Sequence, residues 1–348
     1  MRRSWSSSSK PLGLPSSTFK EQQYGLKTWF QPESPTVDIV FIHGLKGDRD
    51  NTWTAKNSEL PWPQTLLPLK VPEARILTYG YDSQPMNIRS MVSNNRIDNH
   101  AMNLLTALAT HRQEGNSKSR PVIFVAHSMG GLICQDMLVA SKSSPEKHLQ
   151  NVVDSTAGIV FLGTPHSGSA LALYAERLAK FIGLVKTTNP RIIGVLRRDS
   201  EVLARIQSQF HSMIRLRASD GQDPINITCF YEELPLPGVG EVVPHSSAVL
   251  HGYTSIGVHS HHKDMVRFSS LDDPGFISVS GELERWARGL NASDHNKRKE
   301  LMLEAWTSSG SRPHEDLQES RICIGGNVVK SNVVNGSQVI YGSLTFQD

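Results

Sequence analysis

The chain has 348 residues, a net charge of only +3 and 38% hydrophobic residues, so it can bury the core of one large domain or of two smaller ones. Its basic residues form no extended run, which gives no indication of a nucleic-acid partner. It has three cysteines and no apolar run near the roughly 18 residues of a membrane-spanning helix. We therefore expect a cytoplasmic protein in a reducing compartment.

Residues 1–30 are predicted to be a disordered leader. This segment is rich in serine, carries no acidic residue before Glu21 and lacks the apolar core of a secretory signal. Pro11 and Pro15 interrupt any amphipathic helix. A mitochondrial presequence stays open as an alternative, because the segment is basic and serine-rich.

From about Val37 to Leu290, short apolar runs alternate with helical patterns. Continuous apolar runs are typical of parallel strands that helices bury on both faces. We therefore predict an α/β domain over 31–290, with a mostly parallel sheet and a helix over 97–111. The predicted strands are 37–42, 75–79, 122–125, 158–162 and 225–231.

The pattern between Ser169 and Arg217 is helical throughout. Four apolar residues recur there at the spacing of one helix face, namely Leu203, Ile206, Phe210 and Met213. Two interpretations stay open: helices that cover the sheet, or a helical cap insert at about 169–217 over an active site. The cap is considered because this segment follows a strand beside the expected site.

The strongest chemical signal is the stretch VIFVAHSMGGLICQDML around Ser128. A buried strand runs directly into Ala126-His-Ser-Met-Gly130, and a helical pattern starts at once, which is the context of a G-x-S-x-G nucleophile elbow. Ala126 replaces the first glycine of that pattern. Ser128 is the predicted nucleophile, and the N–H of Met129 is predicted to stabilise an oxyanion at the start of the helix.

A second oxyanion donor is expected from the loop after the first strand. The sequence there is His43-Gly-Leu-Lys-Gly47, and the N–H of Leu45 is the predicted donor. His43 is interpreted as a structural histidine, because it precedes the serine and so breaks the Ser–acid–His order of this motif.

The acid and the base are predicted from later strands and loops. Glu232 and Glu233 stand at the end of the strand ITCFYEE, and adjacent strand residues face opposite sides, so only one can serve. We select Glu232 and keep Glu233 as the alternative. For the base we select His262, with His261 as the alternative, on the loop before a helix.

A metal site formed by His259, His261 and His262 was also considered. A zinc site needs ligands and supporting partners from elsewhere, and no cysteine or carboxylate cluster is evident in the sequence. We therefore predict neither a metal nor a cofactor.

Six motifs occur in an order that resembles a known family. They are HGLKGDRDNTW, YGYDS, AHSMGGL, FLGTPHSGS, FYEELP and HHKDMVRF. They resemble the serine esterase/lipase domains of the α/β-hydrolase fold at the N-terminus of fungal NLR-type (NACHT) proteins and SesB-like proteins. More distantly they are similar to glycosylphosphatidylinositol-deacylase-like and SERAC-like lipases. The resemblance implies an α/β-hydrolase fold with Ser128 as nucleophile, Glu232 as acid and His262 as base.

The chain departs from this family at two points. The family's histidine commonly follows an aspartate, where this chain has His261, so the choice between His261 and His262 stays open. No phosphate-binding G-x-x-x-x-G-K-[ST] loop follows the hydrolase region, so nucleotide binding is not implied. The loop 163–168 matches the family and is expected to border the site.

Two further segments complete the predicted organisation. Residues 291–320 are polar and broken by glycine and proline, which predicts a linker, with a short helical pattern at 300–306. Residues 321–348 carry three units in which an amide side chain precedes two β-branched residues: Asn327-Val-Val, Asn332-Val-Val and Gln338-Val-Ile.

Stacking of these units would align the amides in ladders around a dry aliphatic interior, with corners at Gly336 and Gly342. An edge strand on the main sheet, or disorder, would also fit the composition. The segment resembles amyloid-signalling motifs of the Ses/σ kind in fungal death-pathway proteins. That resemblance implies self-assembly through 321–348 and an NLR-type receptor that carries a matching motif.

We therefore predict a serine carboxylic-ester hydrolase, an esterase or lipase, with a lipid or other ester as substrate. Its expected setting is a fungal cell-death or heterokaryon-incompatibility pathway, in the cytoplasm or at a membrane surface. Two alternatives are a housekeeping carboxylesterase with a disordered tail and a non-catalytic scaffold that binds lipid or a partner.

Overall fold

The structure of the protein is a computed structural model. It describes residues 23–83, 94–115, 117–166, 177, 180–181, 190–308, 320–324, 327–334 and 337–339. The chain divides into two compact units, Met1–Ala292 and Ser293–Asp348. Most of the predicted leader and parts of the predicted cap, linker and tail lie outside the described residues.

Unit 1 is built on a seven-stranded sheet with the order β1-β3-β2-β4-β5-β6-β7. The edge strand β1 runs antiparallel to β3, and all other neighbouring strands are parallel. The strands are β1 (Gly25–Phe30), β2 (Val37–Ile42), β3 (Ala74–Gly80), β4 (Val122–His127), β5 (Thr156–Leu162), β6 (Asn226–Glu232) and β7 (Thr254–Val258).

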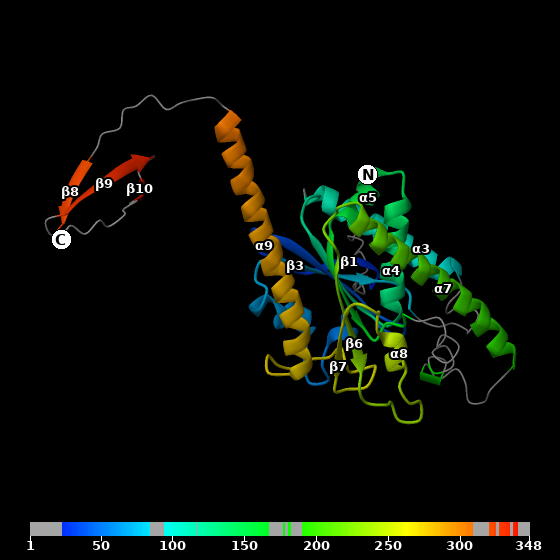
Figure 1. Ribbon diagram of the computed structural model, residues 1–348. Coiled ribbons are helices and arrows are strands. Elements are labelled where there is room, and N and C mark those ends of the chain that lie inside the picture. Colours follow the sequence, from blue (N-terminus) through cyan, green and yellow to red (C-terminus); the bar gives the residue numbers. More distant parts are fainter. Residues whose placement is uncertain are drawn as a thin grey trace, which may run out of the picture. The chain divides into compact units, whose positions relative to one another are not determined.

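Helices cover both faces of this sheet (Figure 1). One hydrophobic core lies under α3 (Asn94–Glu114), α4 (Met129–Ser143), α5 (Lys147–Asp154) and α7 (Pro190–Ser219). The opposite core lies under α1 (Trp62–Thr65) and α9 (Pro274–Ser308), beside the short turns η1 (Asn51–Trp53) and η2 (Leu67–Leu69). A short helix α8 (His245–Ala248) follows β6. This three-layer arrangement confirms the predicted α/β-hydrolase fold.

All five predicted strands are present, because their side chains are apolar on both faces and the sheet is covered twice. The side chains of β2 and β4 are buried at every position. The helical spacing predicted in the insert is also confirmed, since its four apolar residues are buried in one core and belong to α7. They are Leu203, Ile206, Phe210 and Met213.

Unit 1 ends at Ala292, close to the predicted domain end at 290, but two elements cross the predicted boundaries. Residues 25–30 were predicted as leader but form β1, where Trp29 packs on Phe41 with ring centroids 5.7 Å apart. At the other end, α9 runs from Pro274 to Ser308 and so enters the range 291–320 predicted as linker. The helical pattern predicted at 300–306 lies within α9.

A buried ion cluster fixes the amino ends of the strands. Asp38 on β2 is fully buried, and Arg75 donates hydrogen bonds of 2.9 and 2.7 Å to its two carboxylate oxygens. Arg112 and Arg120 donate further bonds of 2.9 and 3.0 Å. Loss of the Asp38 carboxylate would leave buried cations unpaired, which typically costs about 3–5 kcal/mol.

Unit 2 contains a small antiparallel sheet with the order β10-β9-β8. Its strands are β8 (Ser320–Ile324), β9 (Asn327–Val334) and β10 (Ser337–Val339). In the described part, Asn332 pairs with Val339 and Val333 with Gln338, so two of the three amide-containing units are neighbours across the strands.

Candidate active site

The nucleophile elbow lies between β4 and α4. Ser128 has φ 53° and ψ −124°, a left-handed backbone that costs about 1–3 kcal/mol for a non-glycine residue and is typical of functional turns. The loop after β2 lies against it, because a Cβ added to Gly44 would be 2.8 Å from the Cβ of Ser128. The sharp turn therefore holds the Ser128 side chain at the carboxyl end of the sheet.

The structure brings three predicted residues together at this end. His262 Nε2 lies 3.0 Å from Ser128 Oγ, and His262 Nδ1 lies 3.0 Å from Oε2 of Glu232. The second contact is at ion-pair distance but too bent for a standard hydrogen bond. The other carboxylate oxygen, Oε1, accepts a 3.1 Å hydrogen bond from the N–H of Val243. All three side chains are almost fully buried.

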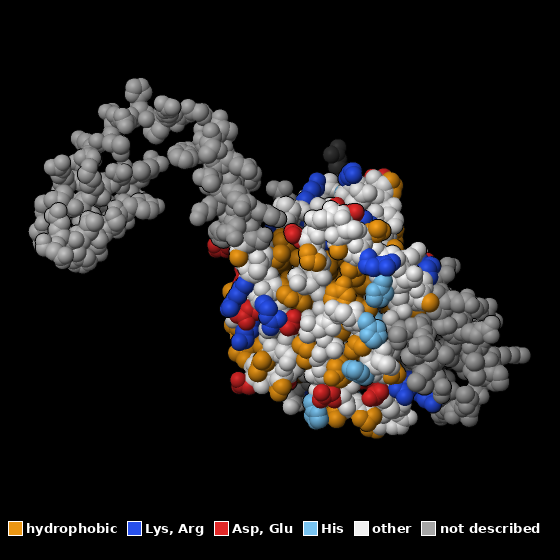
Figure 2. Space-filling view, in the orientation of Figure 1, with side chains coloured by type: hydrophobic (Ala, Val, Ile, Leu, Met, Phe, Trp, Pro, Cys, Tyr) orange, Lys and Arg blue, Asp and Glu red, His pale blue; other side chains and the backbone are white. Residues whose placement is uncertain are grey.

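The two alternatives lie elsewhere. The carboxylate of Glu233 contacts Nδ1 of the exposed His259 at 3.2 Å, on the other side of the strand end. His261 places Nε2 3.3 Å from Asp264 within its own turn. Several histidine side chains are visible at the surface in Figure 2, whereas His262 has no exposed area.

The two predicted oxyanion donors belong to the first turn of α4 and to the loop of Gly44. Met129 is the first residue of α4, so its N–H has no acceptor within the helix and lies at the positive end of the helix dipole. Leu45 precedes Lys46, which has a φ of 56°. The N–H groups of Lys46 and Gly47 donate to Ser83 and Gly44 oxygens at 3.1 and 3.2 Å, which holds this loop beside the serine.

His43 lies in the same loop and has the structural environment that was predicted. Its Nδ1 lies 2.9 Å from the carbonyl of Gly44, and its Nε2 accepts the N–H of Tyr81 at 3.3 Å. The two rings stack with centroids 4.3 Å apart. Burial lowers the pKa of His43 to about 4, so it is neutral near pH 7.

Two residues between β5 and β6, Gly163 and Phe181, lie beside the base. A side chain at Gly163, whose φ is +58°, would come 2.9 Å from the His262 ring, so the start of the loop 163–168 borders the site. The rings of Phe181 and His262 lie nearly perpendicular to each other, with centroids 5.8 Å apart. Nearby, Arg177 donates a 2.7 Å hydrogen bond to the carbonyl of Glu241.

Three contacts were missed by sequence reasoning: the Val243 N–H on Glu232, the Phe181 ring on His262, and a bond from His127 to the backbone of His262. The first two join residues that no motif relates. His127 had a visible signal, since it is a polar side chain within the elbow, but only the fold shows what it contacts.

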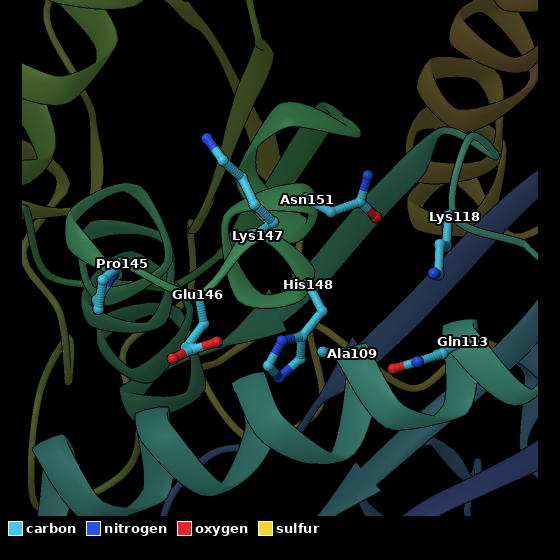
Figure 3. A pocket seen from close by; sticks show the side chains of 8 residues that line it. All are labelled: Ala109, Gln113, Lys118, Pro145, Glu146, Lys147, His148 and Asn151. Carbon is cyan, nitrogen blue, oxygen red and sulfur yellow. The ribbon is translucent and has the colours of Figure 1, made fainter.

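The described part of the chain also has a cavity away from the elbow. No group of three or more His, Cys, Asp or Glu side chains there could hold a metal ion, and no helix among these residues is long and apolar enough to cross a membrane. A cavity of about 480 Å³ lies between α3 and α5 (Figure 3), where His148 points toward α3. It lies near the residues that precede β4 and β5, away from Ser128.

The fold and the elbow define the class of this protein: it contains an α/β-hydrolase domain. A family model described as a PGAP1-like alpha/beta domain matches residues 35–190. That range includes both the loop of Gly44 and Ser128.

The curated relatives are vertebrate proteins. The chain is 29% identical to Protein SERAC1 of Homo sapiens over an alignment of 211 residues, and the match covers 55% of this chain and 30% of that protein. It is 32% identical to Protein SERAC1 of Danio rerio over an alignment of 201 residues, and the match covers 52% of this chain and 29% of that protein. The chain thus spans less than a third of the length of these relatives.

Solved structures with a related arrangement include two esterases. Esterase B from Lactobacillus rhamnosis has 12% identity and a TM-score of 0.43, with coverage of 80% of this chain and 91% of that chain. A carboxyl esterase from Bacillus coagulans has 14% identity and a TM-score of 0.35, with coverage of 76% and 93%.

Proposed function

We propose that this protein is a serine carboxylic-ester hydrolase with Ser128 as nucleophile, His262 as base and Glu232 as acid. The observation that carries the proposal is the chain of two 3.0 Å contacts from Ser128 Oγ through His262 to Glu232. These groups come from three separate segments and meet next to the strained elbow. Nucleophile, base and orienting acid in one line are the arrangement that activates a serine hydroxyl.

The mechanism follows from these positions. His262 Nε2 takes the Ser128 proton as Oγ attacks the ester carbonyl carbon, and the carbonyl oxygen becomes an oxyanion that the N–H groups of Met129 and Leu45 stabilise. Cleavage of the C–O bond releases the alcohol, which takes the proton from His262 and leaves an acyl-enzyme. Water then repeats the sequence and releases the acid. Glu232 orients the imidazole and stabilises its cation.

A fluorophosphonate probe tests the nucleophile and the base together. Wild type should be labelled, Ser128→Ala should not, and His262→Gln should react at least about 10³-fold more slowly. His261→Gln is the matched control and should react at the wild-type rate. Equal labelling of wild type and Ser128→Ala would refute the nucleophile. Equal rates for the two histidine variants would refute the base.

The insert 169–217 is proposed to cap this site, and a lipid ester is the proposed substrate. Support for the cap comes from Phe181, which faces the base, and from Arg177, which binds the loop after β6. The described side chains of α7 pack on the core instead, as a covering helix does. Rates on esters of increasing acyl length measure the substrate preference. Flat rates across the series would contradict a lipid substrate.

The tail 321–348 is proposed to be an assembly motif that regulates the hydrolase. Two of its amide-containing units already pair as antiparallel strands, and its composition is that of stacking segments. The proposed partner is an NLR-type receptor with a matching motif in a fungal cell-death pathway. This setting rests on the sequence resemblance.

A peptide of residues 321–348 tests the tail. It should form fibrils with a strand-spacing reflection near ~4.7 Å, and preformed fibrils should change the ester-hydrolysis rate of the full chain. A peptide that stays monomeric at millimolar concentration would refute assembly. Peptide variants at Asn332, Gln338 and Gly336 should slow fibril formation most.

A further inference from the structure

We propose that His127 is a positioning residue for the proposed base: it holds the backbone of His262 while Ser128 contacts the ring of the same residue. The proposal rests on the triad described above. His127 Nε2 lies 3.1 Å from the carbonyl oxygen of His262, and the two rings lie 4.9 Å apart at 37°. The elbow thus reaches His262 at two points with two consecutive side chains.

The strained turn explains how consecutive side chains can face the same residue. In a regular strand, adjacent side chains point to opposite faces. His127 is the last residue of β4, and Ser128 has left the strand conformation with a φ of 53°. The backbone is therefore redirected between them, and both side chains contact His262, at 3.1 and 3.0 Å. The positive φ of Ser128 therefore both exposes the nucleophile and lets His127 and Ser128 contact His262 together.

The carbonyl oxygen of His262 needs a hydrogen-bond donor from outside its own turn, because the N–H groups of that turn donate to another carbonyl. The N–H groups of Asp264 and Met265 both donate to the carbonyl of His261, at 3.0 Å each. The carbonyl of His262 is buried with its residue, and a buried carbonyl without a donor would cost about 1–3 kcal/mol. The side chain of His127 supplies the donor from across the site.

His127 is suited to this role because it stays neutral. Burial lowers its pKa well below the ordinary value, and the neighbouring charge of His262 lowers it further. Since Nε2 donates to a carbonyl, the proton of the neutral ring is on Nε2 and Nδ1 carries the lone pair. Nδ1 is buried, without a hydrogen-bond partner among the described residues, and faces Gly44, where an added Cβ would be 3.0 Å away.

The consequence concerns the rate of proton transfer. Without the bond from His127, the backbone of His262 is free to shift, and the 3.0 Å distance to Ser128 Oγ is no longer fixed from both ends. A misplacement of about 1 Å can cost about 10²-fold in rate. His127 acts through His262 and does not touch the reacting atoms.

The test compares two variants of one residue. His127→Phe keeps an aromatic ring and removes the donor, whereas His127→Gln keeps a donor at similar reach. With a short-chain ester, His127→Phe should lower kcat by about 10–100-fold with KM nearly unchanged, and His127→Gln should recover most of the loss. His259→Phe is the control for a surface histidine of the same type and should match wild type.

Equal kcat for wild type and His127→Phe would overturn the proposal. It would also be overturned if His127→Gln lost as much as His127→Phe while both melted at the wild-type temperature, since packing of the ring would then be the cause. A second measurement tests the bond even if the variants do not fold, because it uses the wild-type protein. Nitrogen NMR of the wild-type ring should show the Nε2–H tautomer and no protonation from pH 5 to 9, and a Nδ1–H tautomer would refute the bond.

The two proposals fail in different ways. If the fluorophosphonate probe does not label wild type, the hydrolase proposal fails, while the tautomer measurement still decides whether His127 donates to His262. If wild type is labelled and His127→Phe is labelled at the same rate at every pH, only the positioning role fails.

Discussion

Replacement of Glu232 by glutamine should reduce the catalytic rate by about three orders of magnitude. The carboxylate lies with Oε2 3.0 Å from His262 Nδ1, so the charge centres of Glu232 and a protonated His262 are about 4 Å apart. At an effective dielectric constant of about 20, that separation is worth about 4 kcal/mol. In wild type this interaction stabilises the imidazolium that forms on the way to the acyl-enzyme, and the variant loses it. At about 1.4 kcal/mol for each factor of ten, it corresponds to about 10³-fold in kcat.

The amide of the variant also has a geometric conflict. Glu232 Oε1 accepts the N–H of Val243 at 3.1 Å, and Oε2 faces the Nδ1 of His262. Both positions require an acceptor, but a glutamine has one carbonyl oxygen and one NH₂ group. The NH₂ must therefore oppose either the Val243 N–H or the imidazole N–H, which adds disorder of the base to the loss of charge.

The matched control is the neighbouring Glu233→Gln. Its carboxylate contacts the exposed His259, and surface ion pairs contribute only about 0–1 kcal/mol, so its kcat should stay within about threefold of wild type. The assay is the initial rate on a short-chain ester at saturating concentration, with melting temperatures to verify folding. A loss below tenfold in Glu232→Gln, or an equal loss in both variants, would refute the assignment of the acid.

Two further predictions concern stability. Gly131→Ala should lower the free energy of unfolding by about 1–3 kcal/mol, because an added Cβ would overlap the side chain of Thr164. The added Cβ of Gly281→Ala in α9 meets open space, so this variant should raise the free energy of unfolding by up to about 1 kcal/mol. Chemical denaturation measures both variants, and equal effects would contradict the packing. Burial, followed by the nearby charge of Asp98, raises the pKa of Asp136 to about 7. The native state therefore keeps a proton that the unfolded state loses above about pH 4. The free energy of unfolding should fall between about pH 4 and 7, by up to about 1.4 kcal/mol per pH unit. Asp136→Asn should flatten this dependence, and an unchanged slope would refute the shift.

The sheet could be predicted because its strands are buried on both faces. Such strands are continuously apolar, so β2, β4 and β5 stand out from their surroundings without any knowledge of the fold. The edge strands lack this signal. β1 has one fully buried side chain, and β7 has a burial pattern that starts with two exposed residues. Both were missed, because their position in the sheet and not their composition makes them strands.

The elbow could also be predicted, since its chemistry is local. A strand, a serine between small residues and a helix occupy one short stretch, so the sequence contains the whole motif. The contacts that complete the site are not local. Phe181 and Val243 reach His262 and Glu232 only through the folded chain, and nothing in their own sequence surroundings marks them.

Two pairs of adjacent residues at the site behave differently in the fold, and only the first pair was an open choice in the sequence. At the end of β6, Glu232 and Glu233 follow strand alternation, so one contacts His262 and the other His259. At the elbow, alternation is broken by the positive φ of Ser128, and His127 and Ser128 contact the same partner. The neighbouring residue is therefore a valid control for Glu232. It is not a valid control for Ser128, because a variant at His127 should disturb the same base from its other end.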